Sequence, residues 1–192
     1  MSAHLEKIIT AFTPENDKEI FSRDALCALL PALPECLYRT HFAPGHITGS
    51  GFLVSADGQR ILLNHHKFLD KWLHFGGHAD GDSDILNVAR REVEEESGLS
   101  DFTLAYDDIL SIDVHDIPAN KAKQEPAHKH FDVIFLFRLN EGADETPRIS
   151  DESIKLKWAR WDGLAQFSLE PHLQSALDKA HKILKNTQAD AA

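Results

Sequence analysis

The sequence has few residues that would cross-link the chain or anchor it in a membrane. Among 192 residues there are two cysteines, Cys27 and Cys36, and one methionine. Two cysteines without a CxxC pair give neither a disulfide framework nor a zinc knuckle, which fits a reducing cytoplasm. The longest apolar runs, Ile61 to Leu63 and Val133 to Phe137, are too short to cross a bilayer. The N-terminus has no basic region followed by an apolar stretch, so it does not resemble a secretory signal. We therefore expect a cytoplasmic protein without a membrane partner.

Positive charge is also scarce. Lysine and arginine total 20 against 31 aspartates and glutamates, which gives a formal net charge of −11. Such an acidic protein is poorly suited to bind long nucleic acid or an anionic membrane through its general field. A small anionic substrate requires a local reversal of sign, which a bound divalent cation supplies.

What the sequence does contain is an ordinary globular composition, with 42% hydrophobic and 27% charged residues. Helical spacing over residues 3–12 and 16–30 predicts an N-terminal helical extension, residues 1–40, packed on a main domain of residues 41–186. Residues 187–192 are expected to form a flexible tail.

The main domain mixes strands and helices without regular alternation, which indicates an α+β fold. We expect a hairpin around Asp57-Gly58, one or two strands from Phe102 to Val114, and a polar loop from His115 to Lys129. The remaining predicted elements are strands at 47–54, 60–64, 131–139 and 154–161 and helices at 84–97 and 170–184.

The predicted helix from Asp84 to Ser97 breaks the usual rules of packing. On a helical wheel Ile85, Val88 and Ala89 define a stripe that faces the core. The same stripe continues into three carboxylates, Glu92, Glu95 and Glu96. Like charges one turn apart repel, and burial of an unpaired carboxylate is costly. A hard divalent cation resolves the conflict, although a solvated acidic helix end remains the alternative.

The spacing of this segment resembles the Nudix box. Gly77, Arg91-Glu92-Val93, Glu95-Glu96 and Gly98-Leu99 match the pattern of Gly, Arg-Glu-apolar, two Glu and Gly-apolar. One position departs from it, since Ser83 stands where the box usually has a glutamate. Arg91 is therefore expected to be held by Asp82, Asp84 or Glu95. Residues 46–99, with the run Gly-Gly-His-Ala-Asp-Gly-Asp from Gly76, are further similar to a group of bacterial Nudix proteins with a GGHxDGD variant.

This resemblance implies a Nudix fold, a mixed β-sheet sandwiched between helices, with extra N-terminal and C-terminal helices. It implies that Glu92, Glu95 and Glu96, with the carbonyl of Gly76, hold Mg²⁺ or Mn²⁺. It also implies that Glu95 orients or deprotonates the attacking water and that Arg91 orients a glutamate. The expected reaction is hydrolysis of a phosphoanhydride bond in a nucleoside diphosphate derivative.

Other residues are candidates for substrate binding. His128 and His130 alternate on one strand and follow His115 and Asp116, so both rings can face a pocket, or they are surface histidines of a polar loop. Lys67 and Trp72 can contact phosphate and a base, although such a tryptophan is more often core. His78 follows the glycine pair and either lies near the metal or caps the loop.

Two other functional classes compete with the hydrolase. An isopentenyl diphosphate isomerase shares the Nudix fold but relies on a catalytic cysteine near the metal, whereas both cysteines here precede the box-bearing domain. A non-catalytic sensor commonly loses box glutamates, whereas this chain keeps the three that face the metal. The sequence leaves open whether the terminal helices form a homodimer face.

Overall fold

The computed structural model describes residues 2–121 and 124–190. Two helices come first, α1 (Ser2–Ala11) and α2 (Asp17–Leu29), followed by short 3₁₀ turns at Leu30–Ala32 and Glu35–Leu37. The later helices are α3 (Ile85–Ser97) and α4 (Pro171–Asp190), with a 3₁₀ segment at Trp161–Phe167 before α4. None of the helices in the described ranges is long and apolar enough to cross a membrane.

Eight strands of the described chain form one mixed sheet. They are β1 (Gly45–Val54), β2 (Arg60–His66), β3 (Lys71–Leu73), β4 (Phe75–His78), β5 (Phe102–Leu104), β6 (Ser111–Ile117), β7 (His128–Leu139) and β8 (Ser153–Arg160). The central pair, β1 and β7, runs parallel, and the other pairs are antiparallel.

The sheet forks beside β1. Near its end, β1 pairs with β2 through Leu53 and Leu62, but further back it pairs with β4 through Ser50 and Gly76. β2 therefore diverges from β1 and continues against β8 and β3. The wedge between β2 and β4 is where the last turn of α3 arrives.

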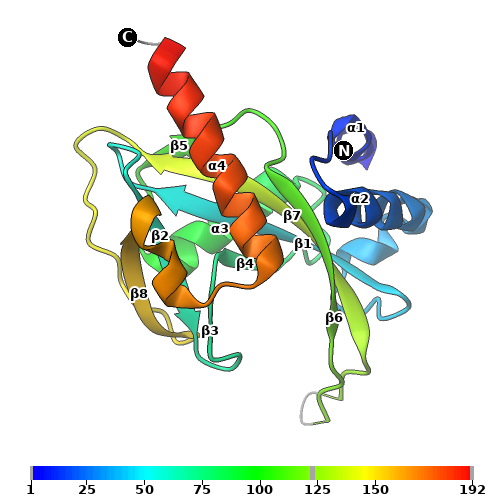
Figure 1. The fold of residues 1–192 in the computed structure, drawn as a ribbon. Helices are drawn as coiled ribbons and strands as arrows, with labels where there is room; N and C mark the ends of the chain where they lie inside the picture. The colour runs from blue at the N-terminus through cyan, green and yellow to red at the C-terminus, as the bar shows by residue number, and fades with distance from the viewer. Residues whose placement is uncertain (1, 122–123, 191–192) are drawn as a thin grey trace.

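Helices cover both faces of the sheet. In Figure 1, α4 crosses in front of the strands, and α3 lies behind them. Two separate apolar clusters fill the two sides, because alternate residues of each strand point to opposite faces. The α3 side also receives Leu5 and Ile9 of α1 and Leu26 of α2, and the α4 side receives Phe52, Ile134 and Leu177. The predicted sandwich of a mixed sheet between helices is confirmed.

Most predicted elements are present, and two differ. The expected polar loop from His115 to Lys129 is shorter, because β6 continues to Ile117 and β7 begins at His128; two residues of the expected loop, 122 and 123, lie outside the described residues. The polar side chains pair across the hairpin, with His115 opposite His130 and Asp116 opposite Lys129. At the other end, α4 runs to Asp190, so the described part of the expected tail is helical; residues 191–192 lie outside the described ranges.

Candidate functional site

The helix α3 begins and ends as its sequence predicts. Asp84 caps its first turn, since its carboxylate accepts a hydrogen bond from the backbone N–H of Asn87 at 3.1 Å. Gly98 ends the helix with a φ of +70°, a left-handed conformation that suits glycine. Asp82 is occupied at the same N-terminus, where it accepts a hydrogen bond from the Asp84 backbone at 2.9 Å.

Two glycines of β1 let α3 lie close to the sheet. A Cβ added at Gly49 would stand 2.9 Å from the carbonyl oxygen of Ile85, and one at Gly51 would stand 2.8 Å from a methyl group of Val93. A larger residue at either position would push the helix away. The close approach brings Gly77 so near to Glu92 that a Cβ on Gly77 would lie 2.6 Å from the carboxylate carbon.

Glu96 lies in the wedge between β2 and β4. The residue is 7% exposed, and its carboxylate accepts hydrogen bonds from Nδ2 of Asn64, at 3.3 Å, and from the backbone N–H of Gly76. Burial, together with the charges of Glu92 and Glu152, raises the pKa of Glu96 from 4.5 to about 8. An acidic group held in this state without a positive partner is a typical ligand for a divalent cation.

Glu92 lies beside Glu96 and shares its environment. Its side chain is 15% exposed and accepts a hydrogen bond from a guanidinium nitrogen of Arg91 at 2.9 Å. Burial raises the pKa of Glu92, and the bond from Arg91 partly opposes this shift. The same guanidinium nitrogen donates to the carbonyl oxygen of His78 at 3.2 Å, so Arg91 ties Glu92 to the end of β4.

The third box glutamate differs from the expectation. Glu95 was placed with Glu92 and Glu96 on the inward stripe, but its side chain is 65% exposed and Val93 takes the buried position. At about 100° per residue, Glu95 falls roughly 80° from the centre of the stripe, at its edge. Asp82, Asp84 and Glu95 were the carboxylates expected to hold Arg91. Of these, Glu95 makes an ion pair with Arg91, at 4.0 Å, but the shorter contact of Arg91 is with Glu92, at 2.9 Å.

A fourth carboxylate, which the sequence reasoning missed, lies at this site. Glu152 precedes β8, and its negative charge contributes to the raised pKa values of both Glu92 and Glu96. The loop that carries it packs against the end of α3, where the backbone N–H of Arg148 donates to the carbonyl of Ser97 at 2.8 Å. The carbonyl oxygen of Glu152 accepts a hydrogen bond from the backbone N–H of Lys67 at 2.8 Å, so the backbone of Lys67 lies beside that of Glu152. Glu152 does not stand out by spacing, because its contacts join distant parts of the chain.

The histidines lie on the other face of the sheet. His78, His128 and His130 point to the α4 side but lie beyond the part of that face that α4 covers, and His46 of β1 joins them. Burial lowers the pKa of His46, and burial with the neighbouring His115 and His46 lowers that of His130 to about 2. The rings of His46 and His130 are therefore neutral at pH 7.

A buried aspartate, Asp132, holds together the strands between the carboxylates and the histidines. Asp132 of β7 accepts hydrogen bonds from Thr48, at 2.8 Å, and Ser50, at 2.7 Å, and lies 3.0 Å from Nε2 of His74. Burial alone would raise the pKa of Asp132, but the bonds from His74 and Ser50 hold it below its ordinary value. The carboxylate thus remains charged and fixes β1, β7 and the segment before β4 to one another.

Trp72 packs against other rings. It stacks on His65 with ring centres 4.8 Å apart and meets Phe167 edge to face at 4.9 Å. Its indole is half-buried beside the α4-side core. This arrangement matches the packing alternative for Trp72, while its partly exposed surface leaves room for a ligand contact.

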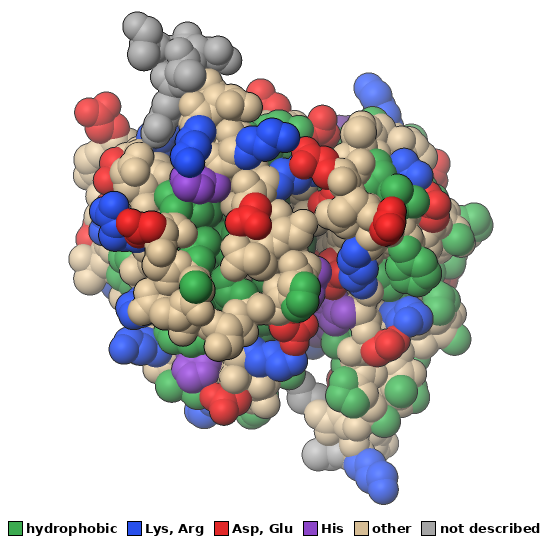
Figure 2. All heavy atoms as spheres, in the orientation of Figure 1, with side chains coloured by type: hydrophobic (Ala, Val, Ile, Leu, Met, Phe, Trp, Pro, Cys, Tyr) green, Lys and Arg blue, Asp and Glu red, His purple; other side chains and the backbone are tan. Residues whose placement is uncertain are grey.

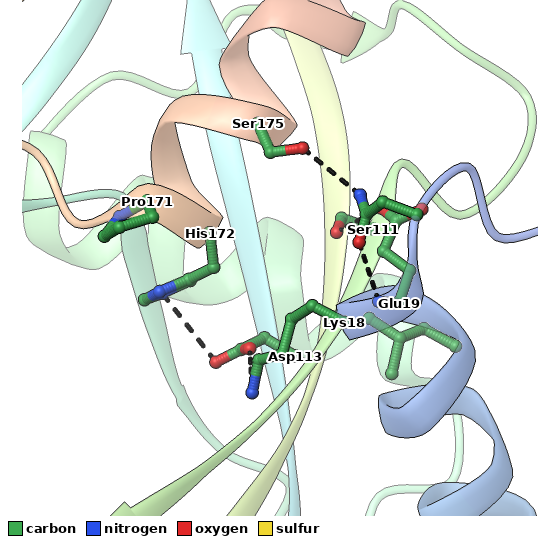
Figure 3. A pocket seen from close by; sticks show the side chains of 9 residues that line it. Lys18, Glu19, Ser111, Asp113, Pro171, His172 and Ser175 are labelled. Carbon is green, nitrogen blue, oxygen red and sulfur yellow. Dashed lines mark hydrogen bonds and ion pairs between the residues drawn. The ribbon is translucent and has the colours of Figure 1, made fainter.

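A cavity of about 330 Å³ lies elsewhere, between α2, β6 and the first turn of α4. Figure 2 shows a hollow with acidic, basic and histidine side chains on this side of the molecule, and Figure 3 shows the cavity from close by. Its charged groups engage one another: Asp113 pairs with Lys18 at 3.0 Å and with His172 at 3.7 Å, and Ser111 donates to Glu19 at 2.7 Å. None of the residues predicted as a site from the sequence lines it.

The geometry and the comparisons with known proteins agree on the family. The family model described as NUDIX domain matches residues 46–180, which include β4, α3 and the carboxylates of Glu92, Glu95, Glu96 and Glu152. The chain belongs to the Nudix family.

Solved structures of other Nudix proteins share the fold. An Ap4A hydrolase from C. elegans is 19% identical, with 73% of this chain and 98% of that chain covered and a TM-score of 0.58. A dihydroneopterin triphosphate pyrophosphohydrolase from E. coli is 16% identical, with 69% and 92% covered and a TM-score of 0.56. At these identities the likeness concerns the fold.

A curated relative adds a likeness in sequence. A probable DHNTP pyrophosphohydrolase from Lactococcus lactis is 29% identical over 82 residues, which are 43% of this chain. The match spans about half, 48%, of that relative's length.

Proposed function

We propose that this Nudix protein is a hydrolase that uses Mg²⁺ or Mn²⁺ to cleave a phosphoanhydride bond in a small nucleoside diphosphate derivative. The observation that carries the proposal is the buried carboxylate of Glu96 beside the partly buried carboxylate of Glu92, in the wedge beside Gly76. The oxygen-rich donor set, with a carboxyl pKa raised to about 8, fits a hard divalent cation. Neither long nucleic acid nor a membrane is proposed as a partner of so acidic a chain.

The residues have separate roles in this proposal. Glu92, Glu95 and Glu96, with the carbonyl of Gly76, bind the cation. When bound, the cation neutralises the diphosphate and lowers the pKa of the attacking water. Arg91 holds Glu92 in place through the contact at 2.9 Å.

The proton of the attacking water requires a base. Glu95 is the candidate from the box, since it is exposed and free to reach a bound substrate. Glu152 is the candidate from outside the box, because its charge acts on both buried glutamates. Glu95→Gln and Glu152→Gln are compared with saturating Mg²⁺: loss of the base removes the corresponding limb from the pH profile of kcat, whereas loss of a neighbouring charge shifts that limb but keeps it.

Substrate contacts are proposed at two places. Lys67 and Trp72 lie on the side of β2 and β3, next to the loop of Glu152. His78, His128 and His130 lie on the face of the sheet opposite Glu92 and Glu96, the same face as the Trp72 indole, so a substrate that touches both these histidines and the carboxylates must pass around the edge strand β4. Alanine at both His128 and His130 is expected to raise KM or lower kcat, and unchanged kinetics on the true substrate would remove them from the pocket.

The isomerase alternative loses support from the position of the thiols. Cys36 is completely buried in the apolar core, and burial raises its pKa to about 11, so the thiol stays protonated and away from substrate. A catalytic cysteine needs the opposite environment.

The decisive experiment is a hydrolysis assay with a panel of nucleotide sugars, ADP-ribose, dinucleoside polyphosphates, pterin and noncanonical nucleoside triphosphates. The Ap4A and dihydroneopterin triphosphate relatives motivate two members of that panel. Turnover should require Mg²⁺ or Mn²⁺, and product masses should show cleavage at a phosphoanhydride. Glu96→Gln should lower kcat by about 100-fold or more, because the cation contributes several kcal/mol. Absence of cleavage across the panel would favour a ligand sensor.

A further inference from the structure

The histidines outside the carboxylate site form a compact group of their own. His46 and His130 stand directly opposite each other on the parallel strands β1 and β7, and His78 ends the neighbouring strand β4. The ring centre of His46 lies 4.8 Å from the ring centre of His130 and 5.1 Å from that of His78. The ring centres of His78 and His130 lie 5.2 Å apart. One nitrogen from each ring can be chosen so that all three lie within 4.8 Å of one another. We call these three residues the imidazole triad.

One nitrogen of the triad is buried without a partner. His46 is 1% exposed, and its Nδ1 faces the carbonyl oxygen of His41 at 3.3 Å. A carbonyl oxygen only accepts, so Nδ1 carries the proton and Nε2 carries the lone pair. Nε2 makes no hydrogen bond. A buried acceptor left in this way destabilises the fold unless something else satisfies it.

The arrangement around His46 is the one that metal-binding histidines use. Such histidines donate the second ring N–H to a carbonyl or carboxylate, which fixes the ring and its tautomer. His128 stands next to the triad, 4.9 Å from His46 between ring centres, and its Nδ1 lies 2.8 Å from the carbonyl of Pro126, so its proton is placed in the same manner.

An anion fits this group less well than a cation. A phosphate is bound by positive or proton-donating groups, whereas the buried Nε2 of His46 offers a lone pair and no proton. Mg²⁺ also fits poorly, because it prefers oxygen ligands in octahedral geometry. Imidazole nitrogens suit zinc and the neighbouring transition metals.

We propose that His46, His78 and His130 bind one Zn²⁺ ion, at a site separate from the carboxylates on α3. In a tetrahedral zinc site the ligand nitrogens are about 3.3 Å apart, from Zn–N distances of about 2.0–2.1 Å, so the three nitrogens, now within 4.8 Å of one another, must draw together when the ion binds. Three protein ligands leave a fourth position for water or for an anionic group. Zinc binding does not require that the protein hydrolyse phosphoanhydrides.

The test is a titration of the full-length, chelator-treated protein with Zn²⁺, followed by calorimetry and elemental analysis after desalting. One equivalent is expected to bind in the presence of excess Mg²⁺. His78→Ala and His130→Asn should each weaken the affinity at least tenfold. The matched controls are His181→Ala, a histidine on α4 stacked on Trp161, and Glu96→Gln at the carboxylate site; both should bind Zn²⁺ as the unchanged protein does.

A measurement on the unchanged protein guards against variants that fail to fold. Histidine-ring NMR should show the nitrogen resonances of His46, His78 and His130 shifting with one equivalent of Zn²⁺, while His65 and His181 stay in place. The proposal is overturned if no tight equivalent binds, if the shifts occur at other histidines, or if Glu96→Gln abolishes binding while His78→Ala retains it. Hydrolysis can fail in the assay above while zinc still binds, so the two outcomes are distinguishable.

Discussion

Replacement of Glu96 by glutamine is expected to make the cation-free protein less sensitive to alkaline pH. Glutamine keeps the size of the side chain and removes the charge that burial opposes. The folded-state pKa of Glu96 is about 8, above the ordinary value of 4.5, so the folded protein binds this proton more tightly than the unfolded chain does. The stabilising effect is therefore full below about pH 4.5 and is lost as pH rises through 8.

The size of the effect follows from the same numbers. Between pH 6 and pH 9 Glu96 loses its proton in the folded state, while the unfolded chain is already deprotonated. The two pH units between pH 6 and the folded-state pKa of about 8, at about 1.4 kcal/mol each, give a loss of about 3 kcal/mol in the free energy of unfolding. Glutamine at position 96 does not titrate, so the variant lacks this contribution.

The assay is urea unfolding in a chelating buffer at pH 6 and at pH 9, compared between the two proteins. The quantity of interest is the difference between their pH dependences, because other groups titrate equally in both. Glu95→Gln is the matched control, since its side chain is mostly exposed and should change this difference little. Equal pH dependence of the unchanged protein and Glu96→Gln would refute the argument that Glu96 is buried without a counter-charge.

Three further predictions concern the same scaffold. Mg²⁺ at 100 times its dissociation constant should stabilise the unchanged protein at pH 8 by about 2.7 kcal/mol. A Tm that calorimetry finds unchanged by Mg²⁺ would contradict the proposed cation site. Gly51→Ala should destabilise the fold by about 1–3 kcal/mol in chemical unfolding, because the added Cβ would stand 2.7 Å from the ring of Phe137; an unchanged midpoint would show that α3 moves freely. Asp132→Asn should destabilise by about 2–4 kcal/mol, since it weakens the hydrogen bonds from Thr48 and Ser50. The contribution of Asp132 is present above its ordinary pKa near 4 and lost as pH falls below it, so the difference between the two proteins should shrink in acid.

Much of the fold was accessible from local patterns. The apolar spacing of α3 depends on neighbouring residues, and the structure has this helix at Ile85–Ser97, where the sequence predicts it. The β6–β7 hairpin was underestimated because His115, Asp116 and Lys129 look like loop residues one at a time. Their role in strands becomes clear only when the two segments are paired.

The site was accessible in part for the same reason. The periodicity of a helix identified Glu92 and Glu96 as inward-facing but placed Glu95 too deeply, because a residue at the edge of a stripe is turned outward by small differences in packing. His46 and Glu152 were missed altogether. Each becomes notable only through a partner distant in sequence: His46 through its register with His130, and Glu152 through its charge on Glu96.

The fork between β2 and β4 determines which parts of the protein are free to vary. The proposed cation ligands there belong to a strand and to a helix that main-chain pairing and close-fitting glycines hold in place. The segment around Lys67 and the described end of the β6 strand lie at the periphery of this frame (Figure 1). A chain built in this way can acquire a different substrate by exchange of its peripheral segments, while the proposed hydrolytic centre stays unaltered.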